Sequence, residues 1–147
     1  MMKTYLASQF HDIMVIMRIL ITGSRKWTDY NILHQAMLDA TTGELTVTVI
    51  TGGAKGADHL AEQIARVHGW TTEVHRADWE KHGKAAGPIR NSQMANETHP
   101  DIVLAFWDGK SSGTKDMIDK AIAKGLYTWV YREDGTFERY YRNSLGL

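Results

Sequence analysis

Apolar and β-branched residues gather into runs along the chain, and mixed stretches of helical spacing separate these runs. The runs cover residues 13–22, 45–51, 101–107 and 126–132, and a shorter β-branched stretch covers residues 70–75. A nearly continuous apolar run is typical of a strand that is buried on both faces of a parallel sheet. We therefore expect five strands in these positions.

The stretches between the runs repeat apolar residues at the spacing of a helix. One helix is expected to begin near residue 29, to have Gly43 as its C-terminal cap, and to bury one stripe of residues: Ile32, Leu33, Ala36, Met37 and Ala40. A second is expected over residues 57–68, ended by Gly69, with Leu60, Ala61, Ile64 and Ala65 facing inward. Two more are expected, one with Pro88 in its first turn that reaches about residue 97, and one over residues 114–124 that Gly125 ends.

Strands that alternate with helices predict parallel strands joined by right-handed crossovers. The expected fold class is α/β: a single Rossmann-like, doubly wound domain with a mostly parallel sheet and helices on both faces. Asp134-Gly135 predicts the turn of a C-terminal hairpin. Because "MRILITGSR" begins at Met17, we assign residues 17–147 to this domain and residues 1–16 to an N-terminal extension that could add to the first strand.

The composition limits the classes of molecule that the protein is expected to bind. The chain has 17 basic and 17 acidic side chains, which argues against a general nucleic-acid or membrane-surface binder and leaves room for a local basic patch. It contains no cysteine, so disulfides and thiolate zinc sites are excluded. The opening lacks the features of a signal peptide and of a membrane span. We therefore expect a soluble, cytoplasmic protein.

Three glycine-rich loops follow strands of the expected sheet: "TGSRKWTD", "TGGAKGAD" and "WDGKSSGTKD". In a doubly wound sheet, ligands bind beyond the carboxyl ends of the strands, where the strand order reverses. Each loop leads into a helix N-terminus, whose free N–H groups favour a phosphate. The proposed cradle in "GKSSGT" is Gly109, Ser111, Ser112, Gly113 and Thr114. The alternative is that the two glycines form only a turn and that Thr114 caps a helix.

Two well-known phosphate motifs are absent from these loops. A Walker loop needs GxxxxGK followed by Ser or Thr, and the dinucleotide fingerprint needs GxGxxG. Neither "GGAKGAD" nor "GKSSGTK" fits the first, and Gly52, Gly53 and Gly56 have the wrong spacing for the second. An ordinary NTPase or a nicotinamide dehydrogenase is therefore not expected.

Four ordered stretches carry a family resemblance: "MRILITGSRKWTD", "TGGAKGAD", "ADWEKHGKAAGPIRNSQM" and "VLAFWDGKSSGTKDMI". Over about residues 17–126 the chain resembles the YspA/YpsA-related branch of the SLOG superfamily, a Rossmann-like group that includes the LOG phosphoribohydrolases and the DprA DNA-processing proteins. The resemblance implies a nucleotide or nucleotide-sugar ligand, ADP-ribose-like or NAD-derived, that is sensed or processed. It also implies ligand-binding roles for these matching positions: Gly23, Ser24, Arg25, Gly52, Gly53, Gly56, Asp58, Arg90, Asn91, Gly109, Gly113 and Thr114. Met94 matches the R-x-x-x-M pattern that begins at Arg90.

One departure from the family pattern concerns catalysis. LOG enzymes read GGxGTxxE with a catalytic glutamate, whereas the position three after Thr114 is Met117 here. The nearby acid is Asp116, on a different side of the helix. Arg90 and Asp116 are the candidate catalytic residues if the protein is an enzyme, which would then be a nucleotide N-glycosidase or phosphoribohydrolase.

Several side chains have two interpretations. Asp58 either accepts hydrogen bonds from ribose hydroxyls or caps its own helix. Arg90 either holds a phosphate with its two-pronged guanidinium or is a solvated helix residue. Trp79 and Trp107 either stack on a base or pack in the core or at its rim, and Trp107 is the better base-stacking candidate because it ends a strand at the site. The histidines show no metal-ligand spacing, so no metal is expected.

Three functions remain open. The leading one is the binding or sensing of a nucleotide-derived ligand at the C-terminal edge of the sheet, with no cofactor required. The first alternative is a LOG-type hydrolase. The second is a DprA-like binder of single-stranded nucleic acid, hinted at by "RADWEKHGKAAGPIR" but disfavoured by the neutral net charge. The tail "TFERYYRNSLGL" and analogy with LOG-like folds would support a homodimer.

Overall fold

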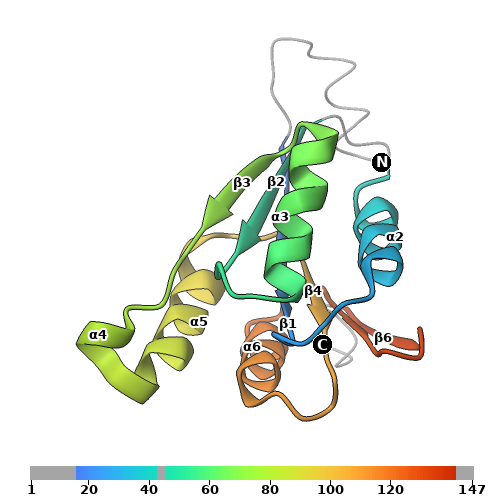
Figure 1. The fold of residues 1–147 in the computed structure, drawn as a ribbon. Coiled ribbons are helices and arrows are strands. Elements are labelled where there is room, and N and C mark those ends of the chain that lie inside the picture. The colour runs from blue at the N-terminus through green and yellow to red at the C-terminus, as the bar shows by residue number, and fades with distance from the viewer. Residues whose placement is uncertain (1–15, 43–45, 142–147) are drawn as a thin grey trace.

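One twisted sheet forms the centre of the molecule (Figure 1). The computed structural model describes residues 16–42 and 46–141. The strands run in the order β3-β2-β1-β4-β5-β6, parallel except for β6, which is antiparallel to β5. Their bounds are β1 Ile16–Gly23, β2 Thr46–Thr51, β3 Thr71–Val74, β4 Ile102–Phe106, β5 Thr128–Tyr131 and β6 Phe137–Tyr140. This topology confirms the Rossmann-like α/β fold, and the β5–β6 pair confirms the C-terminal hairpin.

Helices cover both faces of the sheet (Figure 1). The helical elements are α2 Tyr30–Ala40, α3 Ala57–His68, α4 Trp79–His82, the 3₁₀ turn η1 Gly83–Ala85, α5 Ala86–Glu97 and α6 Ser112–Ala123. On β1, Ile19 and Ile21 pack in one core with α2 and α3, while Leu20 between them packs in another with α5 and α6. Because successive strand residues point to opposite faces, an uninterrupted apolar run supplies both cores at once.

The observed ends of the helices agree in part with those predicted from the sequence. Gly69 ends α3 in the left-handed conformation with φ +71°, as expected from its lack of a side chain. The predicted cap of α2 at Gly43 lies outside the described residues; α2 ends at Ala40, and the Thr41 hydroxyl donates to the carbonyl of Met37 at 2.7 Å. The last helix begins at Ser112 rather than at Thr114, so Gly113 lies within its first turn.

The start of the domain also differs slightly from the prediction. Residues 13–15 of the predicted first strand, like most of the assigned extension, lie outside the described part. Ile16, which was assigned to the extension, already belongs to β1 and pairs with Thr46 of β2. The regular domain therefore begins one residue before Met17.

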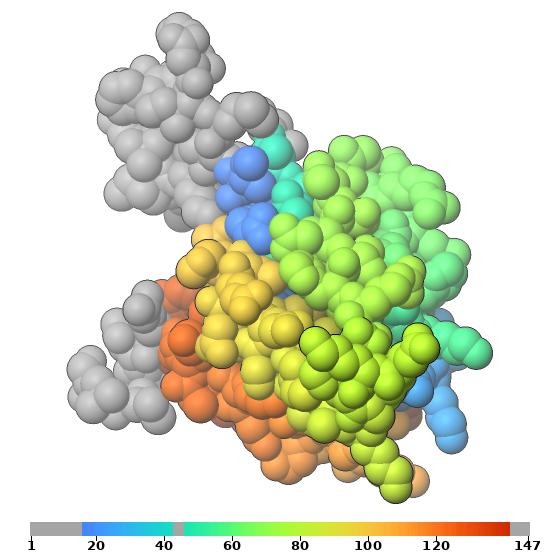
Figure 2. All heavy atoms as spheres, turned by 90° about the vertical axis from the view of Figure 1, so that its left-hand side faces the viewer, coloured from blue at the N-terminus to red at the C-terminus, as the bar shows by residue number. Residues whose placement is uncertain are grey.

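A short helix that sequence periodicity did not predict lies between β3 and α5. Asp78 begins α4 by accepting a hydrogen bond from the Lys81 backbone N–H at 3.0 Å. Figure 2 shows α4 and α5 side by side on one face of the molecule. No helix in residues 16–42 and 46–141 is both long and apolar enough to cross a membrane.

Candidate functional site

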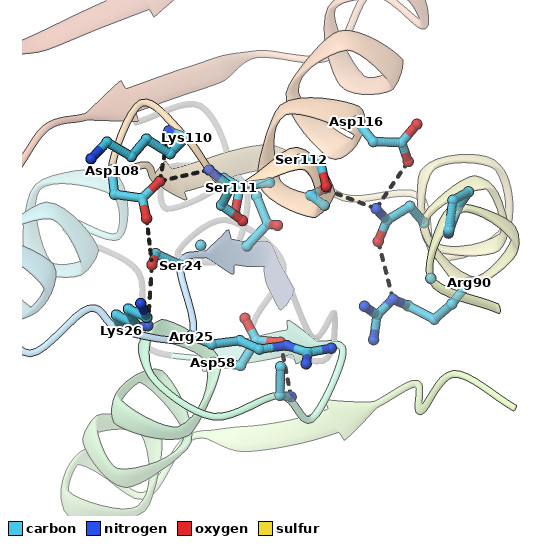
Figure 3. Close-up of a pocket in the computed structure, with 18 of the residues that line it drawn as sticks. Ser24, Arg25, Lys26, Asp58, Arg90, Asp108, Lys110, Ser111, Ser112 and Asp116 are labelled. Atoms are coloured by element: carbon cyan, nitrogen blue, oxygen red, sulfur yellow. Dashed lines mark hydrogen bonds between the residues drawn. The ribbon is translucent and has the colours of Figure 1, made fainter. Parts of the chain in front are cut away.

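A cavity of about 720 Å³ opens at the carboxyl ends of β1 and β4, where the strand order reverses. Its volume lies in the range of small-molecule sites. The loop after β1, the start of α6 and the α4–α5 segment surround it (Figure 3). It is lined by Thr22, Gly23, Ser24, Arg25, Lys26, Ala54, Asp58, Trp79, Lys84, Gly87, Pro88, Arg90, Asn91, Asp108, Lys110, Ser111, Ser112, Gly113, Thr114 and Asp116. Most of the residues singled out in the sequence therefore come together here.

Asp108 joins the two loops at the point where the strand order reverses. The Ser24 hydroxyl donates to one oxygen of Asp108 at 3.1 Å, and the Lys110 and Ser111 backbone N–H groups donate to the other at 2.9 and 2.8 Å. These backbone donors hold the pKa of Asp108 below its ordinary value. Asp108 was not among the predicted site residues, although an Asp two residues before a Lys-Ser pair in a glycine loop is a signal for such a turn.

The first turn of α6 faces the cavity with small side chains. Ser111 is the N-cap residue, and its hydroxyl lies 3.1 Å from the Thr114 hydroxyl instead of capping a backbone N–H. The N–H groups of the following three residues have no partner within the helix, as at any helix start. A Cβ built on Gly113 would meet no atom within 4 Å, so the space in front of this turn is open.

Asp58 lies at the base of the cavity and is 5 % exposed (Figure 3). One carboxyl oxygen accepts hydrogen bonds from the backbone N–H groups of Gly52 and Ala54 at 3.0 and 3.3 Å. Burial raises the pKa of Asp58 to about 7, although these hydrogen bonds and the Arg90 charge act in the opposite direction. Asp58 therefore orders the loop before α3; the cap interpretation is wrong, because Gly56 is the N-cap residue.

Arg90 is held by its neighbours rather than solvated. Its guanidinium donates to the carbonyl of Gly52 at 2.8 Å and to the Asn91 side-chain oxygen at 3.0 Å. Burial lowers the pKa of Arg90 below its ordinary value. The negative charge of Asp58 acts against this shift, and the positive charge of Arg25 adds to it. The fixed position leaves other guanidinium N–H groups available to a ligand.

Asn91 links Arg90 to Asp116. Its amide donates to the carbonyl of Gly113 at 3.1 Å and to the Asp116 carboxylate at 3.0 Å. The same Asp116 oxygen accepts from the Lys120 ammonium at 2.8 Å. Met117, at the position of the family glutamate, is fully buried in the core with α5. The two candidate catalytic residues thus lie in one hydrogen-bonded chain at the cavity wall.

Four of the predicted glycines do not line this cavity. Gly52 and Gly53 line a smaller neighbouring cavity of about 460 Å³. Gly56, with φ +75°, packs against the backbone of the β1–α2 loop, where an added Cβ would lie 2.3 Å from the carbonyl oxygen of Ser24. Gly109, with φ +80°, forms the turn after β4. These glycines shape the loops instead of bordering the main cavity.

Trp79, and not Trp107, has its side chain at the cavity, although Trp107 was the better base-stacking candidate in the sequence. Trp107 does not line the cavity; its indole N–H donates to the carbonyl of Ser111 at 3.0 Å, and the Arg132 guanidinium lies 4.6 Å from its ring centre. Trp79 lines both cavities, is 49 % exposed, and has the Arg25 guanidinium 5.7 Å from its ring centre. The base-stacking candidate at this site is therefore Trp79, which the unpredicted helix α4 positions.

The charge of the cavity wall is mainly positive. Five basic side chains line it, against three acidic ones of which Asp58 titrates near neutrality. Three of the cations were not predicted: Lys26, Lys84 and Lys110. Lys84 belongs to the basic stretch noted in the sequence. Within the described residues, no group of three His, Asp or Glu side chains is placed to hold a metal ion.

Comparisons with known proteins identify the family of the chain. The profile of the YspA, cpYpsA-related SLOG family matches residues 17–82, which include β1, both loops after β1 and β2, and α4. The chain is 42% identical over 115 residues to the "Gene 61 protein" of Mycobacterium phage D29, an alignment that spans 74% of this chain and 91% of that protein. The chain belongs to the YspA, cpYpsA-related SLOG family.

Proposed function

We propose that the protein binds or senses a nucleotide-derived ligand in the cavity at the carboxyl ends of β1 and β4. The ligand is a nucleoside monophosphate or an ADP-ribose-like or NAD-derived molecule. Family membership supports a nucleotide-related ligand in general. The observation that carries the proposal is the convergence of a free helix N-terminus, five cations and a half-exposed tryptophan on one cavity of ligand size.

Each part of a nucleotide has a matching group in the cavity. A phosphate fits the N-terminal turn of α6, beside Lys110, because free N–H groups and a cation both favour an anion there. The ring of Trp79 offers a surface for the base. The sugar hydroxyls lie between them in this arrangement, near the carboxyl of Asp58.

Gly113→Leu tests the phosphate position. The site is open and helical, so the variant should fold with unchanged or slightly raised stability, since glycine inside a helix costs about 0.5–1 kcal/mol relative to alanine. In the wild type, a ligand at a hundred times its dissociation constant should add about 2.7 kcal/mol and raise the melting temperature by roughly 5–10 °C. The variant should lose this shift in a thermal-shift screen of AMP, ADP-ribose and NAD.

The matched control is Asp119→Leu, on the exposed side of the same helix and outside the cavity. It should keep the shift. A folded Gly113→Leu protein that still responds to the nucleotides would contradict the phosphate position. A shift produced only by a single-stranded oligonucleotide would favour nucleic-acid binding instead.

Hydrolysis of an N-glycosidic bond is the second candidate function. Asp58 favours it, because a carboxyl with a pKa near 7 beside a ligand cavity can act as a proton donor or acceptor at neutral pH. The buried Met117 counts against it, since it leaves no acid at the position of the LOG glutamate.

We expect little or no free base when the protein is incubated with AMP, ADP-ribose or NAD. Chromatography of the reaction mixtures measures this directly. Asp58→Asn and Asp116→Asn serve as comparison variants, since each keeps the shape of the side chain and removes its charge. Base release by the wild type that both variants abolish would replace the sensing proposal with the hydrolase.

A further inference from the structure

The smaller cavity adjoins the nucleotide cavity and carries only positive charge. It is lined by Arg25, Gly52, Gly53, Ala54, Lys55, Arg76, Ala77, Trp79 and Arg90. Four of these residues are cations, and no acidic residue is among them. The whole chain has equal numbers of acidic and basic side chains, so the excess of cations is a local property of this cavity.

Two of the four cations are held in place by backbone carbonyl groups rather than by carboxylates. Arg76 donates to the carbonyl of Gly53 at 3.1 Å, and Arg90 donates to that of Gly52 at 2.8 Å. Within residues 16–42 and 46–141, no carboxylate oxygen lies within 4.0 Å of the charged nitrogens of Arg25, Lys55, Arg76 or Arg90. Two guanidinium groups fixed by one loop keep further N–H groups for a ligand, and their planar donor pattern matches a phosphate.

Arg25 and Arg90 line both cavities, as do Ala54 and Trp79. Figure 3 shows the two arginine side chains extending toward each other across the base of the nucleotide cavity. The two positive charges repel each other. In addition to the larger effect of burial, this repulsion lowers the pKa of Arg90. An anion at this boundary would relieve the repulsion.

We propose that the smaller cavity is a second phosphate subsite, so that, within the nucleotide-derived class of the proposed function, a ligand with phosphate groups on both sides of a ribose, such as a nucleoside bisphosphate or a phosphorylated NAD derivative, binds more tightly than a nucleoside monophosphate, ADP-ribose or NAD. This inference rests on the proposed function. The α6 turn lies on the β4 side of the main cavity, whereas Lys55 and Arg76 follow β2 and β3 beyond Arg25 and Trp79. Phosphates on opposite sides of a ribose lie further apart than two directly linked phosphates, so we expect the former to reach both positions better.

Calorimetry with three adenine nucleotides tests the subsite. AMP has one phosphate, ADP has two adjacent phosphates, and adenosine 3′,5′-bisphosphate has two across the ribose. The wild type should bind the bisphosphate at least about tenfold more tightly than AMP, the scale of one charge-assisted hydrogen bond, and more tightly than ADP. Arg76→Gln should remove most of this gain and change the AMP affinity less than about twofold.

Arg66→Gln is the matched control, since it removes one positive charge from the exposed last turn of α3, outside both cavities. It should leave the preference for the bisphosphate intact. The subsite is overturned if AMP and the bisphosphate bind equally, if ADP binds as tightly as the bisphosphate, or if Arg66→Gln weakens binding as much as Arg76→Gln. If none of the three binds the wild type, the proposed function itself fails and the subsite with it.

Discussion

Gly56→Ala should destabilise the protein by about 2–6 kcal/mol. Gly56 has φ +75° and ψ −124°, a combination outside the left-handed helical region that costs an L side chain roughly 1–3 kcal/mol. The added Cβ would also lie 2.3 Å from the carbonyl oxygen of Ser24 and 2.6 Å from the carbonyl carbon of Arg25, which are backbone atoms that cannot rotate away. Overpacking of this kind adds about 1–3 kcal/mol. Chemical denaturation measures the loss, which corresponds to a melting temperature roughly 10 °C lower.

Gly69→Ala is the control for this substitution. Gly69 also has a positive φ of +71°, but its ψ of 20° places it in the left-handed helical region, and an added Cβ there would meet no atom within 4 Å. Its expected cost is therefore the conformational part alone, about 1–2 kcal/mol. Equal losses in the two variants would show that the β1–α2 and β2–α3 loops do not pack closely at Gly56.

Asp58→Asn should change how stability depends on pH. Burial raises the pKa of Asp58 from 3.8 to about 7, so the folded protein binds this proton more tightly than the unfolded chain. The stabilisation is complete below about pH 4 and is lost as the pH rises through 7. At 1.36 kcal/mol per pKa unit, the loss is on the order of 4 kcal/mol. Asparagine has no proton to lose and keeps an oxygen that accepts from Gly52 and Ala54.

Unfolding free energies of the wild type and Asp58→Asn, measured in denaturant from pH 4.5 to 8.5, test this expectation. The stability of the variant relative to the wild type should rise with pH and level off above about pH 8. The other titrating groups cancel in the difference. Asp119→Asn, at an exposed position, should give a difference that stays nearly flat. A flat difference for Asp58→Asn would mean that the carboxyl is ionised throughout, with an ordinary pKa.

The arrangement of the sheet could be predicted because its signals are local. The apolar run before Gly23 contains residues for both faces of β1, and the helical stripe over residues 57–68 gives α3 one buried side. Alternation of such segments restricts the connections to a few topologies. The glycine-rich loops after β1, β2 and β4 then had to meet at one edge, and the order of the strands placed two of them beside the point of reversal.

The roles of single residues in those loops depend on partners distant in the sequence. Ser24 meets Asp108, Gly56 meets Ser24 and Arg25, and Arg90 meets Gly52. The glycine spacing alone was consistent both with a simple turn and with approach to a phosphate. The tryptophan at a strand end, Trp107, was consistent both with packing and with stacking on a base. Trp79 entered the site only because α4, a single turn capped by Asp78, brings it there.

The sequence by itself determined the fold class, the edge of the sheet where the site lies and most of the side chains that border it, because hydrophobic periodicity records which face of each segment is buried. The tertiary structure alone decided that Asp58 holds a loop, that Gly56 allows two loops to touch, and that cations from several loops and helices surround two adjoining cavities. Those properties arise from distances between segments, which no local pattern of residues encodes.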